Sequence, residues 1–93
     1  LFTKHGIMNM RNEKWKYDFS PIEEDGASFV DTLYSKAYLR HLFAAQELLA
    51  LEIASIHNLA FYVWLTQEAR KHILEGDFTS WKSRMLQEVT RRL

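Results

Sequence analysis

Apolar residues recur at three- and four-residue steps through the stretch 31–58, DTLYSKAYLRHLFAAQELLALEIASIHN. This spacing places them along one face of a helix that is buried on one side. The members of that face are Leu39, Leu42, Phe43, Leu49, Ile53 and Ile56. We expect this helical stretch to supply the main apolar surface on which the rest of the chain packs.

The N-terminal residues follow a different pattern, in which short extended runs alternate with turn residues. Residues 1–3 and 7–12 are predicted to form two strands joined by a turn at Gly6, because glycine supplies the positive φ of a tight hairpin. Residues 13–20 alternate aromatic and charged side chains. That pattern is typical of a third extended piece or of an irregular segment packed by its rings, and Pro21 excludes a helix through this region.

Helix start and stop signals divide the remainder of the chain. Asp31 is predicted to cap the first helix, because its carboxylate can accept from free backbone N–H groups. Gly76 is predicted to end a later helix in the left-handed conformation. The expected helices are 32–44, 46–54, 58–75 and 77–93. The pattern leaves open whether the first two are one bent rod or a pair joined by a turn.

These elements predict a mainly α fold, in which a small N-terminal β-hairpin precedes a subdomain of three to four helices. A chain of 93 residues makes one domain or part of one. We divide it into a strand- and turn-rich segment, 1–31, and a helical segment, 32–93.

Composition and charge narrow the classes of function. Twelve basic residues balance twelve acidic ones, so bulk electrostatics does not favour a nucleic-acid binder. An apolar fraction of 47% argues against disorder. The chain has no cysteine, which excludes disulfides and Cys-based metal sites and fits a reducing compartment. Carboxylates interrupt the most apolar window, 42–65, and no signal peptide is evident, so we expect a soluble, cytoplasmic protein.

Isolated titratable residues give weak signals for catalysis. None of the four histidines belongs to an HExxH motif or a Cys/His cluster, and His5 and His72 are predicted to be structural. Glu23, Glu24 and Asp25 lack the ligand spacing of a calcium loop, and no apolar wall is evident that would raise a pKa. We therefore interpret these three carboxylates as a solvated acidic turn.

Two groups of aromatic residues suggest binding surfaces. In the segment Lys14-Trp15-Lys16-Tyr17, aromatic rings that can stack on bases alternate with ammonium groups that can bind phosphates. The same alternation is also typical of the underside of a small sheet. Tyr34, Tyr38 and His41 follow each other at steps of four and three beside the apolar face. Rings of this kind are enriched at protein interfaces, and the alternative is an ordinary half-buried helix face.

Four stretches, taken in order and spacing, resemble one family. They are FTxxGIxNMRN at 2–12, DxxPI at 18–22, YSKAYLRHL at 34–42 and IHNL at 56–59. Together they are similar to the C-terminal part of bacterial tRNA-guanine transglycosylases, also called queuine tRNA-ribosyltransferases. The resemblance covers nearly the whole chain.

The resemblance implies that this chain is a fragment of a larger TIM-barrel enzyme. Members of the family exchange guanine at the tRNA anticodon wobble position for a 7-deazaguanine, preQ1 or queuine, in queuosine biosynthesis. Their two catalytic aspartates belong to the barrel and match no residue here, so this chain alone should be inactive.

The likeness implies a homodimer with Tyr34, Tyr38 and His41 at its interface. Our tRNA contact candidates are Lys14, Lys16, Lys36 and Arg40. The alternative is a non-catalytic helical interaction module or accessory subunit.

The chain departs from the family at its zinc site. The family's three cysteines and one histidine correspond here to Gly26, Ser28, Asp31 and His57. Glycine offers no ligand and a neutral serine hydroxyl is a weak one, whereas structural zinc takes four nitrogen or sulfur donors. We predict that no zinc or other cofactor is bound, and that Asp31, Ser28 and His57 form a hydrogen-bonded patch instead.

Overall fold

The computed structural model describes residues 1–93, and the molecule is elongated, measuring 46 × 21 × 18 Å. Its elements in chain order are β1 (Phe2–Thr3), β2 (Gly6–Ile7), a 3-10 turn η1 (Glu13–Trp15), α1 (Val30–Leu33), α2 (Lys36–Ala44), α3 (Leu48–Glu75) and α4 (Phe78–Val89). The prediction of a mainly α fold with an N-terminal hairpin is confirmed. The division of the chain at residue 31 stays a prediction.

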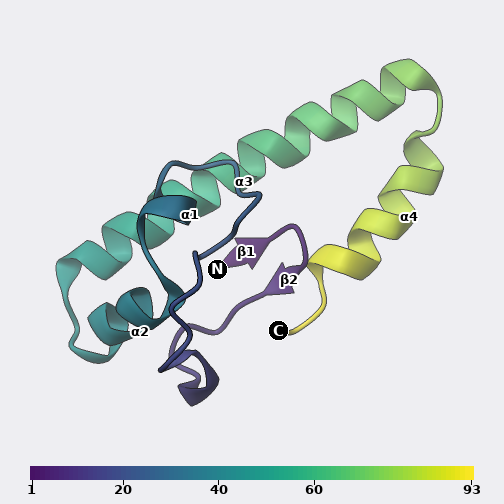
Figure 1. Ribbon diagram of the computed structural model, residues 1–93. Coiled ribbons are helices and arrows are strands. Elements are labelled where there is room, and N and C mark those ends of the chain that lie inside the picture. Colours follow the sequence, from purple (N-terminus) through teal and green to yellow (C-terminus); the bar gives the residue numbers. More distant parts are fainter.

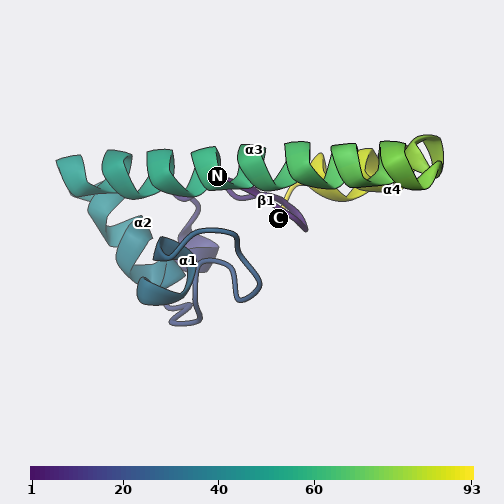
Figure 2. The ribbon, with the colours of Figure 1, turned by 90° about the horizontal axis from the view of Figure 1, so that it is seen from above.

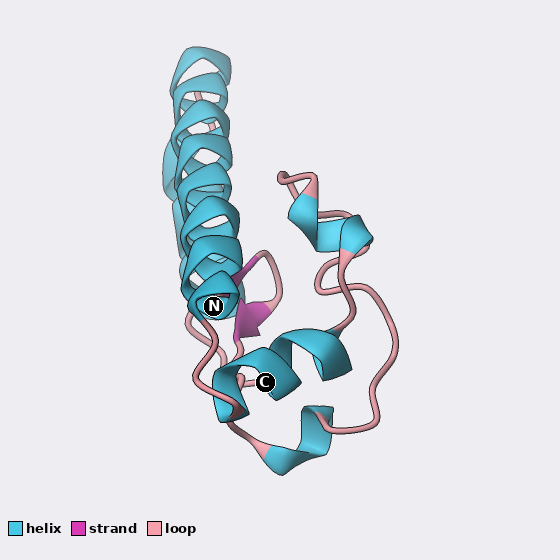
Figure 3. Ribbon diagram, turned by 90° about the vertical axis from the view of Figure 1, so that its left-hand side faces the viewer, coloured by secondary structure: helices cyan, strands magenta, loops and turns pink.

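Helix α3 is the rod around which the other elements are arranged (Figure 1). Helices α1 and α2 pack near its first half, and α4 turns back along its second half. Helices α1 and α2 and the hairpin lie on one side of α3 (Figures 2 and 3), so they leave its opposite face uncovered. By length and composition alone α3 could cross a membrane, but a single apolar helix packed on one side is weak support for that.

The hairpin lies between α3 and the C-terminus. Phe2 pairs with Ile7 and Thr3 with Gly6 in an antiparallel register, which confirms the predicted turn. Gly6 has φ 149°, and a Cβ there would lie 3.0 Å from the Leu93 side chain. The predicted second strand over 7–12 is wrong beyond Ile7, because the backbone of Ile7 pairs next with the C-terminal tail, accepting from the Leu93 amide at 2.9 Å.

The expected helix 32–44 is broken at Tyr34 and Ser35. Helix α2 begins after Ser35, whose hydroxyl accepts from the Tyr38 amide at 3.1 Å as an N-cap. The prediction that Asp31 caps a helix is wrong, because Asp31 lies inside the four-residue α1 and its carboxylate is engaged elsewhere. The strand-like backbone of residues 20–23 runs beside this break, with the Ile22 amide bonded to the Tyr34 carbonyl at 3.2 Å.

The question of one rod or two helices is settled by Gln46. Its φ of 56° is left-handed, and it is the only non-glycine residue of the chain with positive φ. Its amide bonds the Phe43 carbonyl at 3.1 Å, and the next amide, of Glu47, bonds the Leu42 carbonyl at 3.0 Å. These two bonds form a Schellman motif that ends α2. Helix α3 then starts at Leu48, so the predicted start of a third helix at residue 58 is wrong.

The end of α3 follows the sequence prediction. Gly76 takes φ 82°, its amide bonds the Ile73 carbonyl at 3.3 Å, and the Asp77 amide bonds the His72 carbonyl at 3.1 Å. The His72 ring stacks on Trp81 of α4 with centroids 5.0 Å apart. Helix α4 ends at Val89, short of the predicted residue 93, because the last residues leave the helix to pair with β2.

The core is small and lies where α1, α2, α3 and the N-terminal segment meet. Its buried members are Met8, Met10, Ile22, Val30, Leu39, Leu42, Ala50 and Ile53. Leu39, Leu42 and Ile53 were on the predicted apolar face, whereas Ile56 is exposed. Only 16 of the 93 residues are buried. The free energy of unfolding therefore depends on few buried contacts, and the loss of any one of them removes a large share of it.

Candidate functional sites: a buried ion pair and an aromatic, basic surface

Asp31 of α1 and His57 of α3 form an ion pair in the interior. The Nδ1 of His57 faces Oδ1 of Asp31, and each side chain is 1% exposed. Oδ2 of the same carboxylate accepts from the Ser28 amide at 3.0 Å. The carboxylate therefore ties the loop before α1 to the middle of α3. The predicted patch of Asp31, Ser28 and His57 is present, and Ser28 takes part in it through its backbone.

His57 and its neighbour Asn58 also hold strand β1. The Nε2 of His57 donates to the Phe2 carbonyl at 2.6 Å, and the Phe2 amide donates to Oδ1 of Asn58 at 3.1 Å. Two adjacent residues of one helix thus satisfy both polar groups of a single strand residue. No role was predicted for Asn58, and its place in the IHNL motif is the only sequence signal that could have identified it.

The protonation of His57 follows from these partners. A backbone carbonyl only accepts hydrogen bonds, so the Nε2 that faces the Phe2 carbonyl carries a proton, and Nδ1 faces a carboxylate oxygen of Asp31. Burial by itself lowers the pKa of His57, but the hydrogen bond and charge of Asp31, the Phe2 carbonyl and the charge of Glu23 together raise the pKa above its usual value. Both ring nitrogens face oxygen atoms, and the raised pKa favours the doubly protonated ring.

Glu23 is buried beside this pair, so the prediction of a fully solvated acidic turn is wrong for this residue. It is 6% exposed, and its Oε2 accepts from the Lys4 amide at 2.8 Å. Burial raises the pKa of Glu23, against the opposing effects of the Lys4 amide and the His57 charge. Glu24 and Asp25 are exposed, as predicted. Nothing in the local sequence distinguishes the three carboxylates, because the packing of the hairpin over the loop decides which one is covered.

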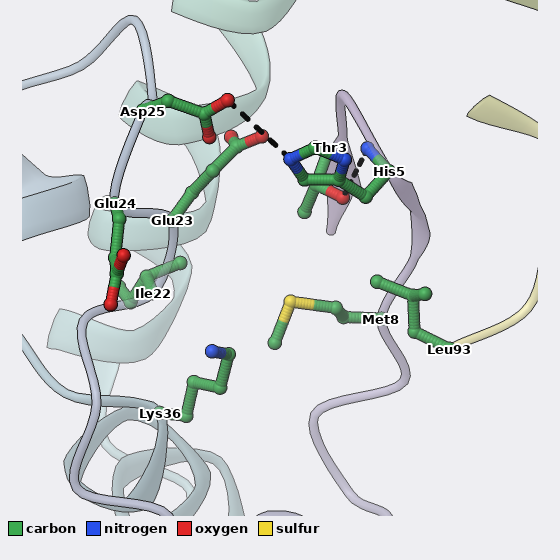
Figure 4. A pocket seen from close by; sticks show the side chains of 9 residues that line it. All are labelled: Thr3, His5, Met8, Ile22, Glu23, Glu24, Asp25, Lys36 and Leu93. Atoms are coloured by element: carbon green, nitrogen blue, oxygen red, sulfur yellow. Dashed lines mark hydrogen bonds and ion pairs between the residues drawn. The ribbon is translucent and has the colours of Figure 1, made fainter. Parts of the chain in front are cut away.

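A pocket of about 490 Å³ opens between the hairpin and the acidic loop (Figure 4). Glu23 and Asp25 reach across it toward His5, whose Nε2 lies 3.4 Å from the exposed carboxylate of Asp25. Met8 and Ile22 line its apolar side, and Lys36 stands at its edge. Both members of this pair are exposed, so the structural role predicted for His5 stays a prediction.

The aromatic, basic segment forms an exposed surface and no part of a sheet. Trp15 is half-buried at the end of η1, and two ammonium groups lie over its ring, that of Lys14 at 4.7 Å and that of Lys36 at 5.8 Å. The Nε of Arg40, one helical turn from Lys36 on α2, donates to the Asn12 carbonyl at 3.2 Å. Residues predicted on separate elements are therefore brought together here.

Two exposed rings follow Trp15 in the chain. Tyr17 and Phe19 are each 75% exposed, and the ammonium of Lys16 lies 5.5 Å from the centre of the Tyr17 ring. Neither ring packs a sheet or a core. We call the residues Lys14, Trp15, Lys16, Tyr17, Phe19, Lys36 and Arg40 the aromatic–basic surface.

The predicted stripe of Tyr34, Tyr38 and His41 does not lie on one helix. Tyr34 ends α1, and only Tyr38 and His41 belong to α2. The two tyrosine rings nevertheless stack, with centroids 5.7 Å apart. Tyr38 and His41 are exposed, so these groups form one aromatic surface even though the helix is broken between them.

Comparison with known proteins assigns the chain to a family. A family model described as queuine tRNA-ribosyltransferase matches residues 1–91. The chain belongs to this family. It is 43% identical over 93 residues to a queuine tRNA-ribosyltransferase of Aquifex aeolicus and 46% identical over 92 residues to one of Helicobacter pylori strain 26695. These alignments cover 100% and 99% of the chain but only 25% of each relative. The chain therefore spans about a quarter of the length of the curated relatives it matches.

The zinc that the family resemblance implies does not fit the residues present. Atoms of Glu23, Asp31 and His57 lie within 4.8 Å of one another, but zinc takes four donors, and Gly26 has no side chain to supply one. Both nitrogens of His57 face oxygen acceptors, so no lone pair is left for a metal. Every buried polar side-chain atom of the chain has a hydrogen-bond partner.

Proposed function

We propose that this chain is the C-terminal part of a cytoplasmic enzyme that exchanges guanine at the anticodon wobble position of tRNA for a 7-deazaguanine base. The observation that carries the proposal is the family match over residues 1–91, together with relatives named queuine tRNA-ribosyltransferase. The activity belongs to the parent protein, in which a TIM barrel supplies the two catalytic aspartates. The chain alone is inactive, and it supports tRNA binding and dimerisation.

The aromatic–basic surface is the proposed contribution to tRNA binding. The chain is neutral overall, so phosphate contacts depend on cations that are gathered locally. Lys14 and Lys36 flank Trp15, and Arg40 lies near the start of the same turn. The exposed rings of Tyr17 and Phe19 can stack on unpaired bases. Cations and exposed rings side by side are the composition of a surface that binds single-stranded RNA.

Tyr34, Tyr38 and His41 are the proposed contribution to a homodimer. Tyr38 is 42% exposed and lies against Tyr34, so a partner could bury a pre-ordered pair of rings. Stacked tyrosines lose little side-chain entropy on binding and keep a hydroxyl for the rim of an interface. This surface runs from the end of α1, at Tyr34, onto α2.

A base-exchange assay tests the proposed function. The protein as its gene encodes it is incubated with labelled guanine and unmodified tRNA, and incorporation of label into the tRNA is the expected result. Residues 1–93 alone, expressed separately, serve as the control and should incorporate none. An encoded protein that binds tRNA or a protein partner without any exchange would support the alternative of a non-catalytic module.

A further inference from the structure

We propose that a metal-free ion pair takes the place of the family's zinc site in this chain, and that the match between Gly26 and Asp31 makes this replacement possible. The inference concerns how the loop before α1 is fastened to α3, so it is independent of the proposed tRNA and dimer surfaces. It rests on three observations, which are the space at position 26, the partners of the Asp31 carboxylate and the partners of the His57 ring.

The space at position 26 is filled by Asp31. A Cβ built on Gly26 would lie 2.6 Å from the Cβ of Asp31 and would overlap its carboxylate. Real Cβ atoms essentially never lie under 3.0 Å from another heavy atom. Side chains at 26 and 31 therefore cannot both be present in this arrangement, as two zinc ligands at these positions would have to be. The loop is closed directly onto α1.

Space is the reason for glycine at position 26 that the structure shows. The glycines of the chain with positive φ are Gly6 and Gly76, so Gly26 does not have the left-handed backbone that favours glycine. An alanine there would be unstrained by its own φ and would clash only with Asp31. The long side chain at 31 and the missing side chain at 26 are therefore complementary.

The ion pair makes the connections that a metal would otherwise make. Oδ2 of Asp31 holds the Ser28 amide of the loop, Oδ1 holds Nδ1 of His57 on α3, and Nε2 of His57 holds the Phe2 carbonyl of β1. Loop, α1, α3 and β1 are thus joined through two side chains. A zinc-bound histidine offers the lone pair of one ring nitrogen, whereas here both ring nitrogens face oxygen atoms of the protein.

Metal content is the first test, made on the protein as its gene encodes it. We expect substoichiometric zinc by elemental analysis and the same melting temperature with and without a strong chelator. Nitrogen chemical shifts of His57 provide a readout that does not depend on stability, and both ring nitrogens should appear protonated at neutral pH. One zinc per chain, a melting temperature lowered by the chelator, or an unprotonated ring nitrogen would overturn the proposal.

A double-mutant cycle tests the match between Gly26 and Asp31. Gly26→Ala should lower the melting temperature by about 5 °C or more in the otherwise unchanged protein, and by much less when Asp31→Gly has already opened the space. Ala27→Gly, at the neighbouring exposed position, is the control for chain flexibility in the loop. An equal effect of Gly26→Ala in both backgrounds would show that Asp31 does not fill the space. Should the variants with Asp31→Gly fail to fold, the nitrogen shifts and zinc content of the unchanged protein still decide the proposal.

Discussion

Nδ1 of His57 and Oδ1 of Asp31 are hydrogen-bonded to each other across 26 positions of sequence, with both side chains 1% exposed. The pair is enclosed by Ser28, Phe2 and Glu23, whose backbone or side-chain groups lie against it. Two charges in the interior of so small a core are tolerated only because each one is fully hydrogen-bonded. Substitutions in this pair therefore test its contribution to the free energy of unfolding, and metal analysis tests whether zinc is bound there.

Removing one charge of the buried pair should destabilise the fold strongly. Asp31→Ala leaves the His57 imidazolium without its partner in the interior, and we expect a loss of about 3 kcal/mol or more in the free energy of unfolding. Asp25→Ala is the matched control, because it breaks the exposed pair with His5 and should cost less than about 1 kcal/mol. Denaturant titration measures both variants. Equal effects would mean that the buried pair contributes no more than a surface one.

The raised pKa of His57 predicts that stability falls as pH rises. Below about 6.5, the pKa of a histidine in an unfolded chain, the contribution is fully present. It is lost as pH rises through the higher pKa of His57 in the folded state, because the folded state then binds more protons than the unfolded chain. Unfolding free energies measured from about pH 6 to pH 9 test this, with His57→Asn as the control.

Glu23 has a raised pKa as well, and its effect has the same sign in a lower pH window. Its contribution is present below about 4.5, the value of an unfolded glutamate, and is lost as pH rises through the folded-state pKa. Glu23→Gln should therefore remove a decline in the acid range and leave the one due to His57. A stability that rises between pH 6 and 9 in the unchanged protein would contradict the assignment to His57.

Replacing Gln46 by glycine should stabilise the protein. Gln46 is left-handed with φ 56°, a conformation that costs a residue with a Cβ about 1–2 kcal/mol. Glycine avoids that cost but loses more entropy on folding, so we expect a net gain of about 1 kcal/mol. Gln46→Val, with a branched side chain, should be destabilising. Thermal melts of the two variants should move in opposite directions, and a lower melting temperature for Gln46→Gly would contradict this account of the turn.

Tyr38 is expected to contribute strongly to the proposed dimer. Tyr38→Ala removes one ring of the stacked pair, and a loss of about 2 kcal/mol or more in dimer stability is expected of an interface hot spot. Sedimentation of the encoded protein measures the dissociation constant. Leu86→Ala on α4, a similarly exposed apolar residue, is the control. An unchanged constant for Tyr38→Ala would remove this surface from the interface.

Lys36 and Arg40 are expected to contact tRNA phosphates. Replacing both with glutamine should weaken binding and reduce the slope of log affinity against log salt by about one unit per lost contact. The double variant Lys71→Gln and Arg70→Gln, on the exposed second half of α3, removes the same charge elsewhere and is the matched control. If the first pair leaves both affinity and slope unchanged, Lys36 and Arg40 are solvated surface residues.

The sequence by itself determined those features whose cause is local. Glycine at positions 6 and 76 marked the hairpin and the end of α3, because positive φ is a property of the residue that adopts it. The spacing of Leu39, Leu42 and Ile53 identified core positions, because helical periodicity is read over a few turns. The IHNL motif at 56–59 identified His57, because the signal of a short motif lies in adjacent residues.

Tertiary structure alone decided how polar side chains were used and where the helices broke. Asp31 is a good N-cap by type, but its carboxylate contacts a buried histidine from α3, and Ser35 is the residue that caps α2. Gln46 adopts a glycine conformation because the packing of α2 on α3 requires a tight turn there. Glu23 is buried because the hairpin covers it. For Asp31 and Glu23 a contact between residues far apart in the sequence outweighs a local preference of about 1 kcal/mol, and no short window of sequence contains both partners.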